Sequence, residues 1–201
     1  MKIKKVYIAA PLYSEKEQKD NREIDKVLQR AGYATFLPQR DGFAYEDLFK
    51  QVQNEGYAYE EARDIALGII MHLDVYQVCE GCDATVLNLT VRNPGEGTIT
   101  ESALCFRSER PLVLYKGNNP SFVLENHSPL LTGQTRFSIV DKVEKIPRKL
   151  KQIEMEVESN YSRTMSIAKE LFKDFDPANK RVDYLASLGK ELFGKEHRKY
   201  D

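Results

Sequence analysis

The chain has no tryptophan, only three cysteines and three histidines, and no excess of charge of either sign. Its 30 Lys and Arg residues nearly balance 31 Asp and Glu residues, which leaves a formal net charge of -1. This balance gives no electrostatic basis for binding a nucleic-acid polymer or an anionic membrane. No apolar run is long enough to span a bilayer, and residues 1–10 lack the pattern of a secretory signal. We therefore expect a cytoplasmic protein.

The scarcity of cysteine and histidine also argues against a metal site. Cys79 and Cys82 form one CxxC pair, but no second pair follows and the histidines are scattered. Half of a zinc site or a redox pair is one interpretation of this motif. Small apolar residues at a helix-to-strand junction are the other. Because G-x-G-x-x-G and Walker loops are absent as well, we predict neither a metal nor a cofactor.

What the chain does have is an alternation of short β-branched apolar runs with helical patterns. The first helical pattern begins at a capping box formed by Ser14 and Glu17. The predicted strands are residues 3–9, 34–37, 84–89, 111–115 and 137–140. Such alternation predicts an α/β fold of the flavodoxin-like or Rossmann-like type. Its open parallel sheet would have about five strands, with helices on both faces.

Residues 46–81 are mostly helical in character, with a break near residues 54–56.

The pattern changes near the C-terminus. From residue 144 onward, apolar residues keep helical spacing among many charges, and residues 182–193 form a further helical stretch. We therefore expect an α/β domain at residues 1–143. A helical extension at residues 144–201 would pack on the core or on a partner subunit.

Open parallel sheets bind ligands beyond the carboxyl ends of their strands. The third loop to leave such an end spans residues 90–98, where Gly97 would let a ligand approach the backbone closely. Thr98 is expected to cap the next helix, which would place Glu101 in its first turn. The same T-x-x-E spacing describes a capping box, in which Glu101 only closes back on Thr98. The pattern alone leaves both roles open.

Several ordered motifs resemble the nucleoside 2-deoxyribosyltransferase family. Its motif after the middle strand runs roughly L-D-G-R-x-x-D-x-G-T-x-x-E-x-G-x-A. The residues that fall in register with it are Leu89, Arg92, Gly97, Thr98 and Glu101. Residues 6–13 resemble the family's opening strand and A-G-P-L-F turn, and residues 111–115 resemble its K-P-V-x-x-Y strand. The likeness covers residues 3–140 and rests on several motifs in order.

The resemblance implies a reaction and three catalytic residues. Glu101 would attack the anomeric carbon of a 2'-deoxyribonucleoside and carry the sugar as a covalent ester. Tyr7 would orient Glu101 through its hydroxyl group, and Asp74 would lie near the base. The spacing from Asp74 to Glu101 is one residue longer than the family's, which a register shift in the helix could absorb.

The resemblance also implies the partners, which are a deoxynucleoside, a free nucleobase and further copies of the chain. In the family, an asparagine from a neighbouring subunit binds the sugar, so we expect a homo-oligomer. Asn126 is the candidate for this role, with Ser128 as the alternative.

The remaining substrate-binding candidates are loop residues. Arg92 and Gly97 belong to the third loop, and Gln39 and Asp41 lie where a base or sugar would pass the second strand. Tyr13 could stack on a base. For Gln39 and Asp41 a structural turn is the competing interpretation, and for Tyr13 it is plain packing.

This sequence departs from the family motif at positions that concern the base. Thr90 and Val91 replace the motif's D-G, and Gly95 replaces an aspartate that helps to hold or protonate the base, with Glu96 as a possible substitute. Two alternatives to transfer of the sugar between bases therefore remain open. One is a hydrolase of (deoxy)nucleoside 5'-monophosphates, which Arg92 and Arg40 would suit. The other is a non-catalytic nucleoside-binding module.

Overall fold

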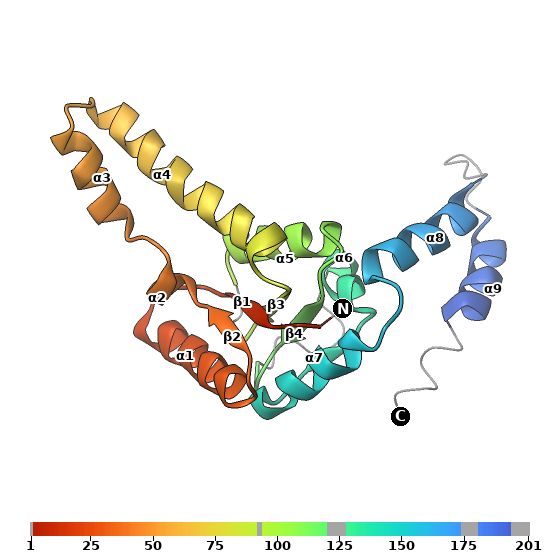
Figure 1. Cartoon of the computed structure of the whole chain (residues 1–201). Helices are drawn as coiled ribbons and strands as arrows, with labels where there is room; N and C mark the ends of the chain where they lie inside the picture. The colour runs from red at the N-terminus through yellow and green to blue at the C-terminus, as the bar shows by residue number, and fades with distance from the viewer. Residues whose placement is uncertain (1, 92–93, 120–127, 174–180, 194–201) are drawn as a thin grey trace. The chain divides into compact units, whose positions relative to one another are not determined.

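The computed structural model describes residues 2–91, 94–119, 128–173 and 181–193 (Figure 1). The chain forms two compact units, Met1–Val157 and Glu158–Asp201. The first unit contains the whole sheet and all the elements that carry the candidate site. Within the described ranges, no helix is both long and apolar enough to cross a membrane.

The sheet has five strands, all parallel, in the order β2-β1-β3-β4-β5. The strands are β1 (Lys5–Ala9), β2 (Ala34–Phe36), β3 (Ala84–Asn88), β4 (Leu112–Tyr115) and β5 (Ile139–Val140). The predicted α/β fold with an open parallel sheet is therefore confirmed. Because β1 is an inner strand, Tyr7 pairs with Phe36 on one side and with Thr85 on the other.

One face of the sheet is covered by α1 (Glu15–Arg30) and α7 (Ile146–Glu154) (Figure 1). Helix α1 begins at the predicted capping box, in which Ser14 and Glu17 bond reciprocally. Successive residues of a strand face opposite sides of the sheet, so Val6 and Ile8 of β1 share one side and point toward these helices. The side chains that they meet there are Ile24, Leu28, Ile146 and Leu150.

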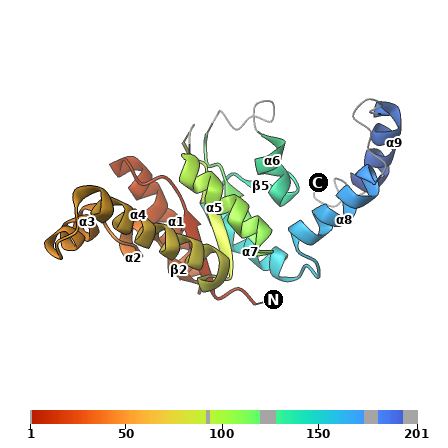
Figure 2. The same ribbon diagram turned by 90° about the horizontal axis from the view of Figure 1, so that it is seen from above.

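The opposite face is covered by α4 (Tyr59–Tyr76), by the π-helical turn η1 (Gln77–Gly81) and by α5 (Glu96–Arg107) (Figure 2). Tyr7 and Ala9 of β1 point into this second core cluster. Helix α4 packs along α3 (Tyr45–Asn54), and both extend beyond the sheet (Figure 1). The break predicted near residues 54–56 is the turn between these two helices.

Residues 38–42, predicted as a loop, contain instead the single helical turn α2 (Pro38–Asp41). Proline suits the first turn of a helix because its missing N–H would be unpaired there anyway. The Asp41 carboxylate accepts a hydrogen bond from the Leu37 N–H at 2.8 Å, which closes the turn.

The helical extension was expected to begin at residue 144, but α7 belongs to the first unit. Ile146 and Leu150 of α7 are fully buried in the core of the sheet, and the unit continues to Val157. Their helical spacing reflects packing on the sheet. The second unit comprises α8 (Asn160–Phe172) and α9 (Val182–Phe193). The short elements of the first unit are α6 (Pro129–Thr132), η3 (Gly133–Thr135) and η4 (Val143–Lys145).

Candidate active site

Side chains from β1, α4 and α5 meet on the second face of the sheet. The Tyr7 hydroxyl donates a hydrogen bond of 2.7 Å to Glu101 Oε1, and it lies 3.2 Å from Asp74 Oδ1. The Tyr7 ring is fully buried and stacks on Phe36, with ring centroids 5.5 Å apart and an interplanar angle of 9°. The stacking fixes the ring, and therefore the direction in which the hydroxyl points.

The start of α5 differs from the sequence prediction. Thr98 does not cap this helix, because α5 begins at Glu96 with Gly95 as the preceding cap residue. Gly95 has φ 84° and ψ 156°, a conformation that glycine adopts at little cost. Glu101 consequently lies in the second turn rather than the first. Its side chain is hydrogen-bonded to Tyr7 of β1 and is not part of a capping box at the helix start.

The buried stripe of α5 explains why Glu101 faces the sheet. Thr98, Ser102 and Cys105 repeat at helical spacing and are 6%, 0% and 0% exposed. Glu101 precedes Ser102 and lies partly buried beside this stripe. The packing that seats α5 on the sheet therefore carries the carboxylate to Tyr7.

Burial changes the acidity of all three groups. It raises the pKa of Glu101 to about 8, against the opposing effect of the Tyr7 hydrogen bond, and the Asp74 charge adds to the increase. Burial also raises the pKa of Asp74. The pKa of Tyr7 is raised by burial first and then by the two carboxylates, so its hydroxyl keeps its proton. One hydroxyl hydrogen cannot serve two acceptors fully, so the two carboxyl groups compete for it and favour binding a further proton.

A π-helical turn, η1, lies between the Asp74 end of α4 and strand β3. In η1 the Cys82 N–H donates to the Gln77 carbonyl at 2.9 Å, a bond from residue i+5 to residue i. A π turn holds one more residue than an α-helical turn, and such turns are frequent at functional sites.

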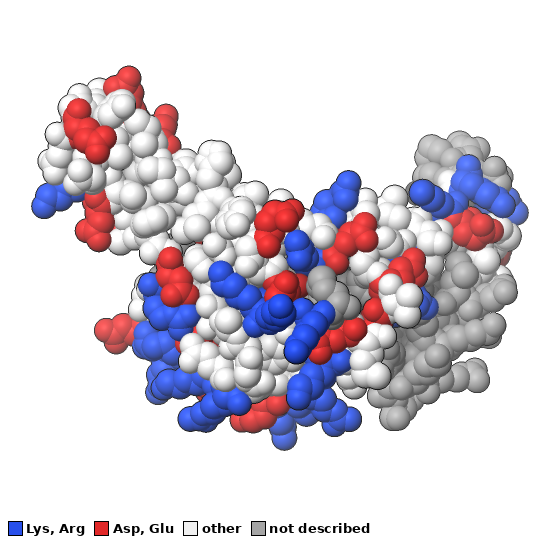
Figure 3. Space-filling view, in the orientation of Figure 1, with Lys and Arg blue, Asp and Glu red and all other residues white. Residues whose placement is uncertain are grey.

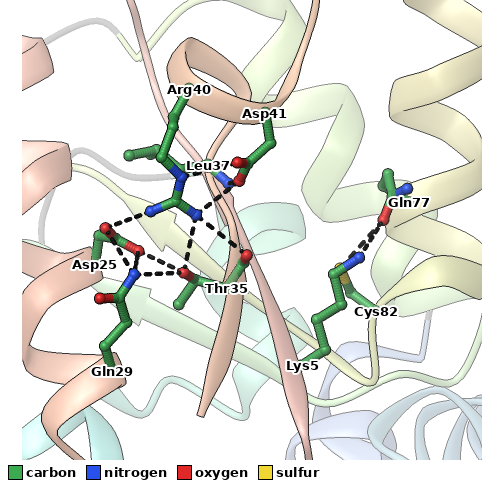
Figure 4. Close-up of polar contacts among 9 residues, drawn as sticks. All are labelled: Lys5, Asp25, Gln29, Thr35, Leu37, Arg40, Asp41, Gln77 and Cys82. Atoms are coloured by element: carbon green, nitrogen blue, oxygen red, sulfur yellow. Dashed lines mark hydrogen bonds and ion pairs between the residues drawn. The ribbon is translucent and has the colours of Figure 1, made fainter.

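Gln39 and Asp41 make protein contacts at the end of β2. Gln39 accepts a 3.1 Å hydrogen bond from Asn21 and donates a 3.0 Å bond to the Gln18 carbonyl. Asp41 is paired with Arg40, whose hydrogen bonds hold the pKa of Asp41 below its usual range (Figure 4). These contacts are those expected of the structural-turn interpretation.

The remaining described candidates for substrate binding lie at or just before the starts of helices. Tyr13 is 92% exposed just before α1. Gly97 has open space where a β-carbon would lie, and it belongs to the first turn of α5. Arg92 and Asn126 lie outside the described residues. Ser128, the alternative to Asn126, is the residue that precedes α6.

Sequence reasoning missed a buried asparagine pair at the carboxyl edge of the sheet. Asn88 at the end of β3 donates a 2.7 Å hydrogen bond to Asn21 of α1, and they are 1% and 0% exposed. Asn21 in turn donates to the Pro11 carbonyl at 2.9 Å and to Gln39. The pair thus connects the loops that follow β1 and β2 to β3. A polar residue at the end of the apolar run ATVLN was the signal that could have indicated it.

A third asparagine holds the loop after β3. Asn119 is 8% exposed and donates hydrogen bonds of 2.8 Å to the carbonyls of Leu89 and Val91. This loop leads to Gly95 and the start of α5. Its first residues are therefore anchored to the chain that follows β4.

The three cysteines are free thiols. Cys82 and Cys105 are buried, and burial raises their pKa to about 11 and about 12, so both stay protonated. Cys79 and Cys82 lie in and just after η1, at the junction before β3. Among the described residues, no three potential ligands of the His, Cys, Asp and Glu types gather where a metal ion could bind.

No protein-family model and no curated protein sequence matches the chain. A conserved protein from Enterococcus faecalis V583 has a similar structure, with a TM-score of 0.56 and 17% identity over 76% of this chain and 99% of that one. At this identity the likeness shows a shared fold. A 2-deoxyribosyltransferase from Bacillus psychrosaccharolyticus aligns at TM-score 0.41, with 20% identity over 65% of this chain and 81% of its own. A CMP N-glycosidase from Clostridium botulinum aligns at TM-score 0.43, with 18% identity over 74% and 99%.

Proposed function

We propose that this protein transfers a 2-deoxyribosyl group between nucleobases, with Glu101 as the nucleophile. The observation that carries the proposal is the 2.7 Å hydrogen bond from Tyr7 to Glu101. This hydrogen bond is partly buried, and Tyr7 belongs to β1, which is paired with a neighbouring strand on each side. A carboxylate held by a phenol suits attack on an anomeric carbon. The ordered motifs shared with the nucleoside 2-deoxyribosyltransferase family support the same role.

The reaction has two displacements at C1' of the sugar. In the first, an oxygen of Glu101 bonds to C1', the C1'–N bond breaks, and its electron pair leaves with the base. In the second, a nitrogen of another base bonds to C1' and the ester bond to Glu101 breaks. Tyr7 binds Oε1, so Oε2 is the oxygen that would attack. Both steps pass through a cationic, oxocarbenium-like state.

Burial serves this chemistry because it strengthens the attraction between a carboxylate and a developing cation. Positive charge at C1' favours the ionised form of Glu101 and so lowers the pKa that burial had raised. A proton that leaves Glu101 can pass to the Tyr7 oxygen while the Tyr7 hydrogen passes to Asp74. Asp74 would then be the acid that protonates the departing base.

Exposed apolar side chains on one face of α4 are compatible with the expected homo-oligomer. Leu67 (49% exposed), Met71 (51%) and Val75 (36%) are apolar residues at i, i+4 and i+8 of this helix, so they share one face. Figure 3 shows a largely uncharged surface where α4 approaches the sheet. We propose that a second copy of the chain covers this surface, as a contiguous apolar patch on a helix favours association.

One assay tests the function. Thymidine and adenine are incubated with the protein, and the products are separated by chromatography. Deoxyadenosine supports transfer. Thymine without deoxyadenosine would mean hydrolysis, and the same assay with deoxycytidine 5'-monophosphate would then identify a monophosphate hydrolase. Saturable binding of thymidine without turnover would mean a binding module. Either result would contradict the proposal.

A further inference from the structure

A second contact joins β1 to the π turn beside the Tyr7–Asp74 contact, one step further along both elements. Lys5 and Tyr7 are alternate residues of β1 and so face the same side of the sheet. Lys5 Nζ donates a 3.0 Å hydrogen bond to Gln77 Oε1, and Gln77 follows Asp74 by three residues (Figure 4). The pairs Lys5–Gln77 and Tyr7–Asp74 therefore lie side by side between strand and helix.

The surroundings of Gln77 keep its side chain in this place. A β-carbon on Gly81 would lie 2.5 Å from Gln77 Oε1, so the glycine leaves the space that the amide occupies. The Cys82 thiol lies 3.6 Å from the same oxygen (Figure 4). The π turn thus folds around the Gln77 amide.

Further contacts hold Lys5 in place. Asp83, which follows the π turn, accepts hydrogen bonds from the Lys4 and Lys5 N–H groups at 2.8 and 2.9 Å. The Lys5 ammonium also lies 5.4 Å from the centroid of the Phe36 ring, which stacks on Tyr7. Backbone and side chain of the same residue thus join β1 to both ends of the π turn.

From this arrangement we infer that Lys5 and Gln77 are positioning residues, which set the helical register that brings Asp74 to the Tyr7–Glu101 pair. The inference rests on the proposed function for its effect on catalysis. A π turn is rare and less favourable than an α-helical turn, and the Lys5–Gln77 hydrogen bond stabilises it from the neighbouring strand. Without a fixed register, the end of α4 could relax toward α-helical geometry and rotate Asp74 away from Tyr7.

The charged and titratable groups that face Glu101 are Tyr7 from β1 and Asp74 from α4. The Asp74 charge raises the pKa of Glu101, and the Tyr7 hydrogen bond lowers it. A displaced Asp74 therefore predicts a lower Glu101 pKa. A purely structural role for Gln77 would change the melting temperature without moving that pKa.

The test is Gln77→Leu, with Gln77→Glu as the conservative variant that keeps an acceptor for Lys5. Gln53→Leu is the matched control, because Gln53 is exposed on α3. The Glu101 carboxyl is titrated by carbon-13 NMR, with Glu101→Gln to assign its signal, and kcat is measured against pH. In Gln77→Leu we expect the Glu101 pKa to fall by roughly half a unit to one unit. We expect kcat to fall roughly ten- to hundredfold with little change in KM.

Gln77→Glu should restore both values, and Gln53→Leu should match the wild type. An unchanged Glu101 pKa in folded Gln77→Leu would overturn the inference. Should Gln77→Leu fail to fold, Lys5→Met removes the same contact from the strand side and is judged by the same titration. The titration requires no turnover, so a wild-type protein without transferase activity would refute the proposed function and still leave the positioning role decided.

Discussion

Tyr7 and Glu101 are separated by 94 positions in the sequence, yet a hydrogen bond of 2.7 Å joins their side chains. The contact exists because β1 is an inner strand and α5 lies over it. A tyrosine whose own pKa is raised by burial remains protonated, and so remains a donor, over the pH range in which Glu101 titrates. The carboxylate is therefore held by a partner that does not itself titrate in that range.

Replacing Glu101 should abolish turnover. Glu101→Ala removes the nucleophile, and we expect transfer of the deoxyribosyl group to fall by at least about a thousandfold. The measurement is the thymidine–adenine assay, together with mass spectrometry of quenched wild-type enzyme to locate the sugar adduct. Circular dichroism serves as the folding control. An adduct on a residue other than Glu101 would contradict the assignment.

The raised pKa of Glu101 predicts how stability depends on pH. A carboxyl whose pKa is about 8 when folded, against an ordinary value of 4.5 for glutamate, favours folding most at low pH. This contribution decreases as pH rises from about 4.5 through about 8. Glu101→Gln removes the cost of burying the charge, so we expect its Tm at pH 9 to exceed that of the wild type by roughly 2–8 °C.

Scanning calorimetry of both proteins at pH 5 and pH 9 checks this expectation. At pH 5 the two melting temperatures should lie close together, because the buried wild-type carboxyl is then largely protonated. A Tm difference that is equal at both pH values would show that ionisation of Glu101 has no part in it.

Tyr7→Phe should move the pH dependence of activity in the direction opposite to Gln77→Leu. The Tyr7 hydroxyl lowers the pKa of Glu101, so its removal raises that pKa further. Because the nucleophile must be ionised, the rise of kcat/KM with pH should occur at higher pH. We expect kcat to fall roughly a hundredfold, as for the loss of one donor to a reacting oxygen. Steady-state kinetics between pH 5 and pH 10 measures both effects, with Tyr57→Phe as an exposed control. An unchanged profile would exclude the hydrogen bond from catalysis.

The asparagine pair should matter for both stability and substrate binding. Asn88→Ala leaves Asn21 buried without one of its partners, which costs about 1–3 kcal/mol. Urea denaturation of Asn21→Ala, Asn88→Ala and the double variant forms a mutant cycle. We expect a coupling of at least about 0.5 kcal/mol, and an increase in KM because the loops after β1 and β2 lose their anchor. Additive single effects would mean that the contact contributes nothing to folding.

A charge on the exposed face of α4 should disrupt the proposed oligomer. Met71→Asp places a carboxylate on the apolar surface, which cannot be buried against a second copy without a large penalty. Sedimentation velocity should show a larger species for the wild type and a monomer for this variant. Lys50→Asp, an exposed position on α3, is the control and should leave the distribution unchanged. A wild-type protein that is monomeric and fully active would refute the proposal that a second copy covers this face of α4.

The sequence by itself determined the fold class, because the patterns that encode it are local. Alternating short apolar runs and helical stripes give the parallel sheet, and the capping box at Ser14 fixes the start of α1. The motif around Glu101 also marked this residue as a candidate before any contact was known. Tyr7 and Asp74 were predicted as its partners from the resemblance to a family and not from a physical argument.

The tertiary structure alone decided how these residues meet. The start of α5 depends on the positive φ of Gly95, and the place of Asp74 depends on a π turn stabilised by Lys5, which is 72 positions away from Gln77. The Asn21–Asn88 bond likewise joins residues 67 positions apart. Hydrogen bonds between distant residues and single backbone angles leave no periodic trace in a sequence. They form only when the sheet brings its strands and helices together.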